Sequence, residues 1–271
     1  MMAEMASDLP WIDLGAHLRV NVPDADAACS EARRNIVRGT GFSMATLNLD
    51  HAVHLDQPGP FRDAYAAHSH ITADGMPIAW LARRAGVPIN RVTGADLVIP
   101  FARIAAEANA SVGLIGATAK VLNRAAAALS KTCPGVTVAL RISPSFPFDP
   151  FGPEAASMIS RIGESGTRMC FLALGAPRQE ILAARIFAAR PDMGVISVGA
   201  GIDFIAGTVR RAPGIFQKSC LEWLWRVAHE PRRLGPRYWR CARQLPRLVA
   251  DARPHDAAHY WLGAASEPAG P

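Results

Sequence analysis

The sequence of 271 residues has no long hydrophobic run and no cysteine framework. A membrane-spanning helix needs about 18 consecutive apolar residues, so a chain without such a run is expected to lie on a membrane if it acts there. Glu4 and Asp8 interrupt the N-terminus, where we expect no signal peptide. The five cysteines are odd in number and lack Cys-x-x-Cys spacing, which is typical of a reducing, cytoplasmic compartment.

Three patterns that would indicate other chemistry are incomplete. The stretch Gly199–Gly201 begins like a dinucleotide fingerprint, but Phe204 stands where the third glycine belongs. The stretch Asp24–Asp26 has the spacing that some sugar transferases use for a metal, but acids at the start of a helix explain it. His51 and His54 lie three residues apart without a third ligand. The sequence therefore predicts no metal ion and no cofactor.

Positive charge is concentrated in one segment of the chain. Lys and Arg total 29, whereas Asp and Glu total 23. Between Thr208 and Arg247 there are ten basic and two acidic residues, which leaves 19 basic and 21 acidic residues elsewhere. Such a local field indicates a polyanionic partner, which can be a phosphate, a lipid headgroup or a nucleic acid.

Short apolar runs alternate with helical patterns along most of the chain. This alternation predicts an α/β fold whose parallel sheet is covered on both faces. A strand or hairpin is expected within 11–22, and further strands are expected at 42–49, 111–116, 136–143, 168–174 and 194–199. Helices are expected at 23–38, 51–55, 78–85, 117–129, 153–163 and 177–190. We assign residues 1–218 to this core and residues 219–271 to a basic, aromatic-rich C-terminal appendage.

Polar residues and glycines follow several of the predicted strands. Ligands of an open parallel sheet bind beyond the carboxyl ends of its strands. The residues at these exits are Thr46, Asn48, Gly116, Gly175–Glu180 and Gly199–Asp203. At Gly175–Glu180, the free N–H groups of a helix start could bind a phosphate together with Arg178 or Gln179. An ordinary strand-to-helix turn, with Glu180 favourable in the first helical turn, explains the same residues.

Asp74 lies in a predicted loop, residues 72–77, just before a helix that Pro77 is expected to begin. An aspartate at this place can cap the helix. It can also act as a general base. The spacing leaves both interpretations open.

Seven motifs, taken together, resemble the WecG/TagA/CpsF family of bacterial glycosyltransferases. They are TLN (46–48), ADGMPIAW (73–80), RVTGADL (91–97), GLIGATAKV (113–121), LGAPRQE (174–180), VGAGIDFIAG (198–207), and RAP (211–213) followed by LEWLWR and EPRR. They occur in the family's order and span about residues 41–240. The chain departs from the family's usual pattern in two places. It has GAGID where the family has a different small-residue turn before the acid that matches Asp203, and it has SPSFPF in place of the usual PPF. Both departures concern the shape of the donor pocket.

The resemblance implies a Rossmann-like core with a C-terminal appendage. It implies an inverting, metal-independent transfer of a sugar from a UDP-sugar, typically UDP-N-acetylmannosamine, to an undecaprenyl-diphosphate-linked saccharide in cell-surface polysaccharide synthesis. It also implies that Asp74 is the catalytic base. The positions that match substrate-contacting residues of the family are Thr46, Asn48, Arg91, Gln179 and Asp203. The strand exits described above add Gly116 and Arg178 to this candidate site.

The basic appendage is expected to dock on the inner face of the plasma membrane. The segment LEWLWRVAHE, residues 221–230, predicts a short helix, and a second helix is expected to begin near Pro236 and to fray after about Asp251. Arg233, Arg237 and Arg240 could share one face and contact anionic headgroups. Few acids lie near them in the sequence to serve as partners.

Two alternatives to membrane docking stay open at this point. Trp223 and Trp225 suit either the headgroup region or the protein core. The whole chain could instead be a nucleotide- or nucleic-acid-binding α/β protein whose arginines bind a phosphate backbone and whose aromatic residues stack on bases. The order of the seven motifs favours the transferase, for which no nucleic-acid partner is expected.

Overall fold

The computed structural model describes residues 7–213, 225, 227, 228 and 231–252. A six-stranded parallel sheet has the strand order β4-β3-β8-β7-β5-β6, and an antiparallel hairpin, β1-β2, lies apart from it. The strands are β1 (Ile12–Asp13), β2 (Arg19–Val20), β3 (Phe42–Leu47), β4 (His70–Ala73), β5 (Ser111–Ile115), β6 (Thr137–Ile142), β7 (Met169–Leu172) and β8 (Gly194–Ser197). The predicted α/β fold with a parallel sheet is confirmed.

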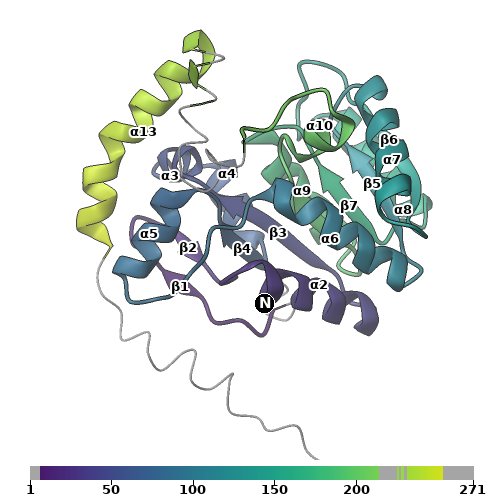
Figure 1. Ribbon diagram of the computed structural model, residues 1–271, viewed down its shortest axis with the longest axis horizontal. Coiled ribbons are helices and arrows are strands. Elements are labelled where there is room, and N and C mark those ends of the chain that lie inside the picture. Colours follow the sequence, from purple (N-terminus) through teal and green to yellow (C-terminus); the bar gives the residue numbers. More distant parts are fainter. Residues whose placement is uncertain (1–6, 214–224, 226, 229–230, 253–271) are drawn as a thin grey trace, which may run out of the picture.

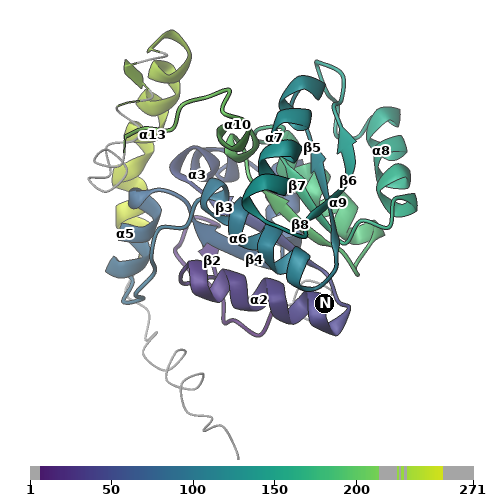
Figure 2. The same cartoon turned by 45° about the vertical axis from the view of Figure 1, so that its right-hand side comes forward.

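Helices cover both faces of this sheet (Figures 1 and 2). They are α2 (Ala25–Arg38), α3 (Leu49–Leu55), α4 (Pro60–Ala67), α5 (Met76–Arg84), α6 (Gly94–Glu107), α7 (Ala119–Thr132), α8 (Pro153–Glu164), α9 (Arg178–Ala189), α10 (Gly201–Ala206) and α13 (Pro231–Asp251). On one face, α2, α6, α7 and α10 bury a core that includes Phe42 and Phe171. On the other face, α8 and α9 pack over Leu172 and Val195. Central strands β3, β7 and β8 are therefore buried at every residue.

Side chains at the helix starts fix where several helices begin. The Asp24 carboxylate accepts a hydrogen bond from the Ala27 amide at 2.8 Å and so caps α2. Thr93 and Asp96 form a capping box at the start of α6. Asp24 therefore has the capping geometry that its place before a helix predicts, rather than that of a metal ligand.

The sequence pattern does not predict β4, α4, α6 or α10. Strand β4 has four residues, and two of them, His70 and Thr72, are polar although both are buried. Helix α6 contains Pro100, which interrupts a helical pattern. Helix α10 has six residues and begins in a glycine-rich segment that predicts a turn. The strands and helices predicted between residues 11 and 199 are present.

The C-terminal helix α13 is continuous although it contains Pro236 and Pro246. The expectation that a helix begins near Pro236 is therefore wrong. Leu234 and Leu248 are buried, and α13 packs against α3 (Figure 1). Leu248 also joins the core formed by the hairpin, α3, α4 and α5. This packing compensates for the backbone hydrogen bonds that the two prolines remove.

Part of the predicted appendage lies outside the described residues. Of the expected helix 221–230, the structure describes 225, 227 and 228, each of which is helical. Trp225 is half-buried, whereas Trp223 is not described. The expected domain boundary between residues 218 and 219 also lies outside the described part of the chain, as does all but the first residue of the end that is expected to fray after about Asp251.

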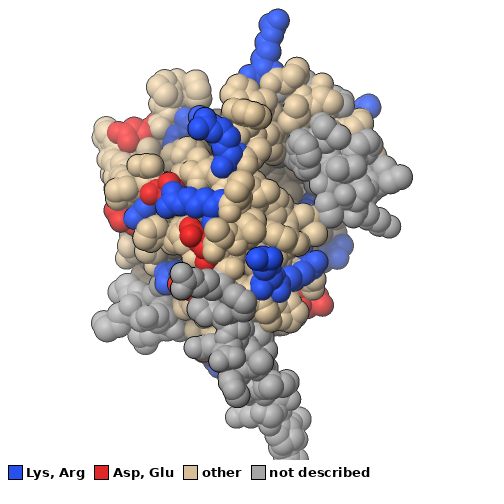
Figure 3. All heavy atoms as spheres, turned by 90° about the vertical axis from the view of Figure 1, so that its left-hand side faces the viewer, with Lys and Arg blue, Asp and Glu red and all other residues tan. Residues whose placement is uncertain are grey.

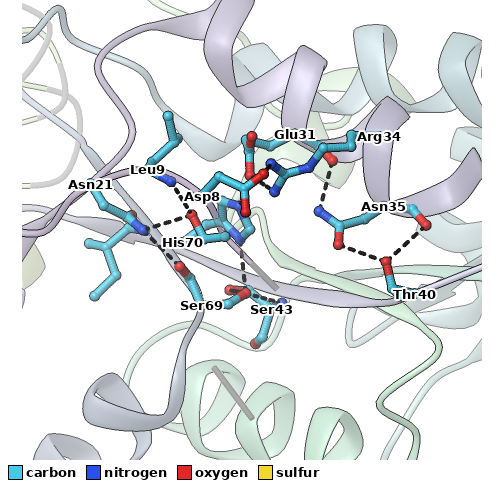
Figure 4. Close-up of polar contacts among 12 residues, drawn as sticks. Asp8, Leu9, Asn21, Glu31, Arg34, Asn35, Thr40, Ser43, Ser69 and His70 are labelled. Atoms are coloured by element: carbon cyan, nitrogen blue, oxygen red, sulfur yellow. Dashed lines mark hydrogen bonds and ion pairs between the residues drawn. The ribbon is translucent and has the colours of Figure 1, made fainter. Parts of the chain in front are cut away.

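A buried polar network joins α2 to the starts of β3 and β4 (Figure 4). The His70 imidazole has Nε2 2.9 Å from Glu31 Oε2 and Nδ1 2.8 Å from Ser69 Oγ. The Ser69 hydroxyl accepts a hydrogen bond from the Ser43 amide at 2.9 Å. Arg34 forms an ion pair with the same Glu31 carboxylate. Burial lowers the pKa of His70 even though Glu31 opposes this effect. These hydrogen bonds allow the polar first residue of β4 to be buried inside the fold.

Replacing Glu31 by Ala is expected to lower the free energy of unfolding by about 3 kcal/mol, because Arg34 and His70 lose their shared buried acceptor. Urea denaturation followed by circular dichroism measures this loss. The matched control is Glu107→Ala. Glu107 pairs with Arg33 at 2.7 Å, but both side chains are more than half exposed, so the loss should stay below about 1 kcal/mol. Equal losses in the two variants would contradict a stabilising role for the network.

Candidate functional site

The carboxyl ends of the parallel strands bring several candidate residues together. Strand β3 pairs with β4 so that Thr46 lies opposite Thr72 and Leu47 lies opposite Ala73. The Asp74 amide donates a hydrogen bond to the Leu47 carbonyl at 2.7 Å. Asp74 therefore leaves β4 directly beside the end of β3. Thr46 itself is 4% exposed and lies within β3, rather than beyond it as the sequence suggests.

Asp74 precedes α5 but is not its N-cap residue. Helix α5 begins at Met76, and Gly75 occupies the N-cap position. Gly75 has a φ of 98°, a backbone conformation that favours glycine. The capping interpretation of Asp74 requires a position that Gly75 takes. The N-cap interpretation is therefore wrong, and the general-base interpretation stays a prediction.

Arg91 lies next to Asp74 in the fold. An isolated parallel bridge joins Arg91 to Ala73, the last residue of β4. The Arg91 guanidinium lies 3.9 Å from the Asp96 carboxylate, whereas Arg211 approaches that carboxylate to 2.7 Å. Arg211 is therefore the closer partner of Asp96, and the longer contact leaves Arg91 more freedom to bind a ligand.

A buried hydroxyl and a buried imidazole lie beneath this edge of the sheet. Tyr65 Oη donates a hydrogen bond to the Thr46 carbonyl at 3.1 Å and lies 2.6 Å from His51 Nδ1. Burial lowers the pKa of His51 to about 3, so the imidazole is neutral. Burial raises the pKa of Tyr65, and the charges of Glu180 and Asp74 raise it further. Both carboxyl groups therefore lie within electrostatic range of one hydroxyl.

The turn between β7 and α9 is held by the Gln179 side chain. Its oxygen accepts a hydrogen bond from the Gly175 amide at 3.2 Å, and its nitrogen donates one to Glu180 Oε1 at 2.6 Å. Gln179 is 4% exposed and Glu180 is fully buried. The Arg178 guanidinium lies 5.7 Å from the centre of the exposed Phe146 ring. This turn thus combines a buried amide–carboxyl pair with a surface arginine at the start of α9.

Gly116 directly follows β5, and Asp203 lies in α10, the helix that follows β8. Gly116 has a φ of 119°, and a side chain there would meet the Ala173 backbone at 2.6 Å. Close packing of two strand ends therefore requires glycine. Asp203 lies in the first turn of α10, where the Thr208 hydroxyl donates to its carboxylate at 3.1 Å. These contacts explain both residues structurally, and ligand binding at either one stays a prediction.

Helix α13 reaches the site region through α3. The Asn48 side chain accepts a hydrogen bond from the His51 amide at 3.0 Å and caps α3. In the first turn of α3, Asp50 forms an ion pair with Arg237 of α13 at 3.2 Å. The charge of Arg237 also contributes, after burial, to the lowered pKa of His51. The candidate residues at the end of β3 therefore lie close to α13.

Two arginines of α13 pair with acidic side chains in or beside α3. Arg237 faces α3 and Arg247 lies 3.1 Å from Asp56. Their acidic partners come from α3 and its end, which are distant in the sequence. The side chain of Arg233 lies outside the described part of the chain. The exposed basic residues of α13 are Arg232, Arg240, Arg243 and Arg247. Figure 3 views the molecule from the α13 side and shows basic side chains across this face.

Neither a metal site nor a membrane span is found in the part of the chain that the structure describes. There, no group of three or more His, Cys, Asp or Glu side chains is placed to hold a metal ion. His51 faces Tyr65, whereas His54 lies 4.0 Å from Asp50, so the two histidines do not converge. None of the helices in these residues combines the length and the apolar character needed to cross a bilayer.

Comparison with known proteins places the chain in a family. The sequence pattern of the "Glycosyl transferase WecG/TagA/CpsF family" matches residues 14–266. The chain belongs to this family. One relative, from Bacillus spizizenii, is named N-acetylglucosaminyldiphosphoundecaprenol N-acetyl-beta-D-mannosaminyltransferase. It is 24% identical over 225 residues, which cover 81% of this chain and 83% of the relative. The chain is therefore a glycosyltransferase, as the seven motifs imply.

Two buried residues of this WecG/TagA/CpsF glycosyltransferase, Tyr65 and Glu180, receive no site role from the sequence. Tyr65 lies in α4, which the sequence pattern does not predict. Glu180 is interpreted from sequence as an acid that favours a helix start, yet it is buried. Its spacing from Ala183 and Phe187 places all three on one helical face, and that face packs inward. Helical periodicity could therefore have identified the burial of Glu180.

The stability of the protein is expected to fall as the pH drops from about 6.5 towards about 3. Burial lowers the pKa of both His51 and His68 to about 3, so the unfolded chain takes up protons that the folded chain excludes. Each histidine contributes up to about 1.4 kcal/mol of loss per pH unit. Chemical denaturation at several pH values measures the slope.

The variant His51→Asn should make this slope shallower. His54→Asn changes an exposed histidine of the same helix and should leave the slope as in the parent protein. Identical slopes for the parent and His51→Asn would show that His51 is not held neutral by burial.

Proposed function

We propose that this glycosyltransferase transfers a sugar from a UDP-sugar to an undecaprenyl-diphosphate-linked saccharide during synthesis of a cell-surface polysaccharide. The donor sugar is N-acetylmannosamine or a related hexose or uronic acid. Membership of the WecG/TagA/CpsF family supports sugar transfer. The name of the Bacillus spizizenii relative supports the lipid-linked acceptor and the aminosugar.

The position of Asp74 is the observation that carries this proposal. Asp74 follows β4 at the ligand-binding edge of the sheet, with Arg91 beside it and its charge within range of Tyr65. One-step transfer with inversion needs a base that removes the proton of the acceptor hydroxyl while the nucleotide leaves from the opposite face. We assign this role to Asp74. Thr46, Asn48 and Asp203 are assigned to positioning the sugar and the nucleotide.

The leaving UDP gains negative charge as the bond to the sugar breaks. The start of α9 provides a favourable helix dipole for such a charge, although the Gln179 backbone amide already donates a hydrogen bond to the Gly175 carbonyl at 3.1 Å. Arg178 is the first residue of α9, and Arg91 lies on the Asp74 side. We assign both arginines, with Gln179, to the diphosphate. The proposal includes no metal ion in this step, because these fixed donors can stabilise the charge themselves.

Replacing Asp74 by Asn is expected to lower turnover roughly 10²- to 10⁴-fold, because a general base contributes about this much. UDP binding and thermal stability should stay close to those of the parent. The assay combines UDP-N-acetylmannosamine with undecaprenyl-diphosphate-linked N-acetylglucosamine in the presence of EDTA, and mass spectrometry quantifies the product. Asp63→Asn, which changes an exposed carboxylate in the first turn of α4, is the control and should keep parent turnover.

Two results would refute parts of this mechanism. Turnover near the parent level in Asp74→Asn would exclude Asp74 as the base. Loss of parent activity in EDTA with recovery on addition of Mg²⁺ or Mn²⁺ would refute the metal-free step.

We also propose that α13 docks on the anionic inner face of the plasma membrane. The acceptor that we propose has a lipid tail, so the site must reach a membrane. Arg240 lies on the exposed face of α13 beside Trp239, which is 68% exposed. Tryptophan and arginine together suit the headgroup region. Because Arg237 pairs with Asp50, we assign it to holding α13 on α3. Arg233 keeps the membrane role that the sequence predicts.

Replacing Arg232, Arg240 and Arg243 together by Glu is expected to weaken binding to phosphatidylglycerol vesicles roughly 100-fold, because each arginine near an anionic surface contributes about 1 kcal/mol. Vesicle sedimentation at low salt measures the binding, and added salt should weaken binding of the parent. The charge-matched control changes three exposed arginines elsewhere, Arg38, Arg103 and Arg161, to Glu. Equal weakening in both triple variants would exclude a specific docking face. Binding of an oligonucleotide in place of vesicles would favour the nucleic-acid alternative.

A further inference from the structure

Glu180 is a carboxyl group that the fold keeps out of water. It lies in the first turn of α9, has no exposed surface and contacts the layer between α9, α4 and the sheet. An acid in the first helical turn normally interacts with the helix dipole from the surface. Its burial in this transferase therefore needs another explanation.

Only one of the two carboxyl oxygens of Glu180 has a hydrogen-bond partner. Oε1 accepts a hydrogen bond from Gln179 Nε2 at 2.6 Å, whereas Oε2 is buried without a hydrogen-bond partner. None of the salt bridges between described residues includes Glu180. Burial raises the pKa of Glu180 to about 7, and the Gln179 amide only partly opposes this. A glutamate that lacks a cation partner destabilises the folded state when it ionises.

The groups that face Glu180 belong to the candidate site. Tyr65, from α4, has its pKa raised by burial and then by the charges of Glu180 and Asp74. The His68 ring, at the end of α4, lies against the Glu180 backbone. On the α9 side the neighbour is Gln179. Glu180 thus faces one phenol, one neutral imidazole, one amide and, across Tyr65, the proposed base.

Glu180 also determines how the Gln179 amide is oriented. The amide oxygen is taken by the Gly175 amide at 3.2 Å, and one of the two amide hydrogens is taken by Glu180. Because both the oxygen and the nitrogen of the amide are hydrogen-bonded, the amide group cannot rotate so that the two atoms exchange places. Gln179 thus has one amide hydrogen that is not used by Glu180, at the turn to which we assign the diphosphate.

We propose that Glu180 is a positioning residue of the transfer site, which fixes the Gln179 amide and places a second carboxyl group in the layer that contains Asp74 and Tyr65. This inference rests on the proposed sugar transfer, and it deepens that proposal at the same site. A buried carboxyl that costs stability and lies among candidate site residues is typical of a functional group.

The first test uses stability and needs no substrate. The folded-state pKa of Glu180 lies above that of an unfolded glutamate, so the parent loses stability as the pH rises from about 4.5 to about 7. Glu180→Gln removes this loss. The melting temperature of Glu180→Gln, minus that of the parent, should therefore be higher at pH 8 than at pH 5 by roughly 5 °C. Glu164→Gln, an exposed glutamate of α8, should show no such difference.

The second test asks whether Glu180 acts through Gln179. Glu180→Met and Gln179→Met are each expected to lower kcat about 10- to 100-fold, a usual effect of a misplaced site group. The double variant should lose no more than Gln179→Met alone, because the two residues form one unit. In Glu180→Gln, which keeps an acceptor for the Gln179 amide, kcat should recover towards the parent value. In the parent, ionisation of Glu180 is expected to change kcat/KM near pH 7. In Glu180→Gln this pH dependence should be absent.

Several outcomes would overturn the inference. These are parent kcat in Glu180→Met, independent losses in the double variant, or a melting-temperature difference in Glu180→Gln that does not change with pH. If the parent itself transfers no sugar from UDP-N-acetylmannosamine to the lipid-linked acceptor, the proposed function fails. The same variants are then compared by urea denaturation, where additive effects of Gln179→Met and Glu180→Met would separately refute the pairing of the two side chains.

Discussion

The parallel register of β3 against β4 and β8 is the constraint on which the rest of the site depends. Backbone hydrogen bonds between these strands determine which residues leave the sheet at the same level. Because all six strands of the sheet point the same way, their carboxyl ends form a single edge. Asp74, Thr46 and the start of α9 come from distant parts of the sequence, and the sheet alone brings them to that edge.

Much of the fold could be predicted because its signals are local. Strands β5, β7 and β8 are short apolar runs, and a helical pattern follows each of the first two. Strand β4 could not be predicted, because His70 is polar and its burial depends on Glu31 of α2. The continuity of α13 through Pro236 likewise depends on packing against α3. In both cases the deciding contact comes from a segment far away in the sequence.

Some residues of the candidate site could likewise be predicted from the sequence, whereas the contacts of others could not. Asn48 could be found because it lies at the end of a predicted strand, and Asp74 because it precedes a predicted helix within a motif of the family. Arg237 is basic in the sequence, but only the fold shows that Asp50 is its partner. Glu180 has the sequence position of a surface acid, and its burial becomes visible once α9 lies on the sheet. Sequence motifs identify residue types at strand ends, whereas tertiary packing determines which of them face a ligand and which face each other.

Burial favours the uncharged form of three titratable side chains in this fold. Burial lowers the pKa of His51 and His68 to about 3 and raises that of Glu180 to about 7. All three side chains are therefore uncharged over the same mildly acidic range. Near neutral pH, the proton on Glu180 is the first that this layer can release. Because the charges of both Glu180 and Asp74 raise the pKa of Tyr65, a change in the protonation of Glu180 also changes the electrostatic environment of the candidate site.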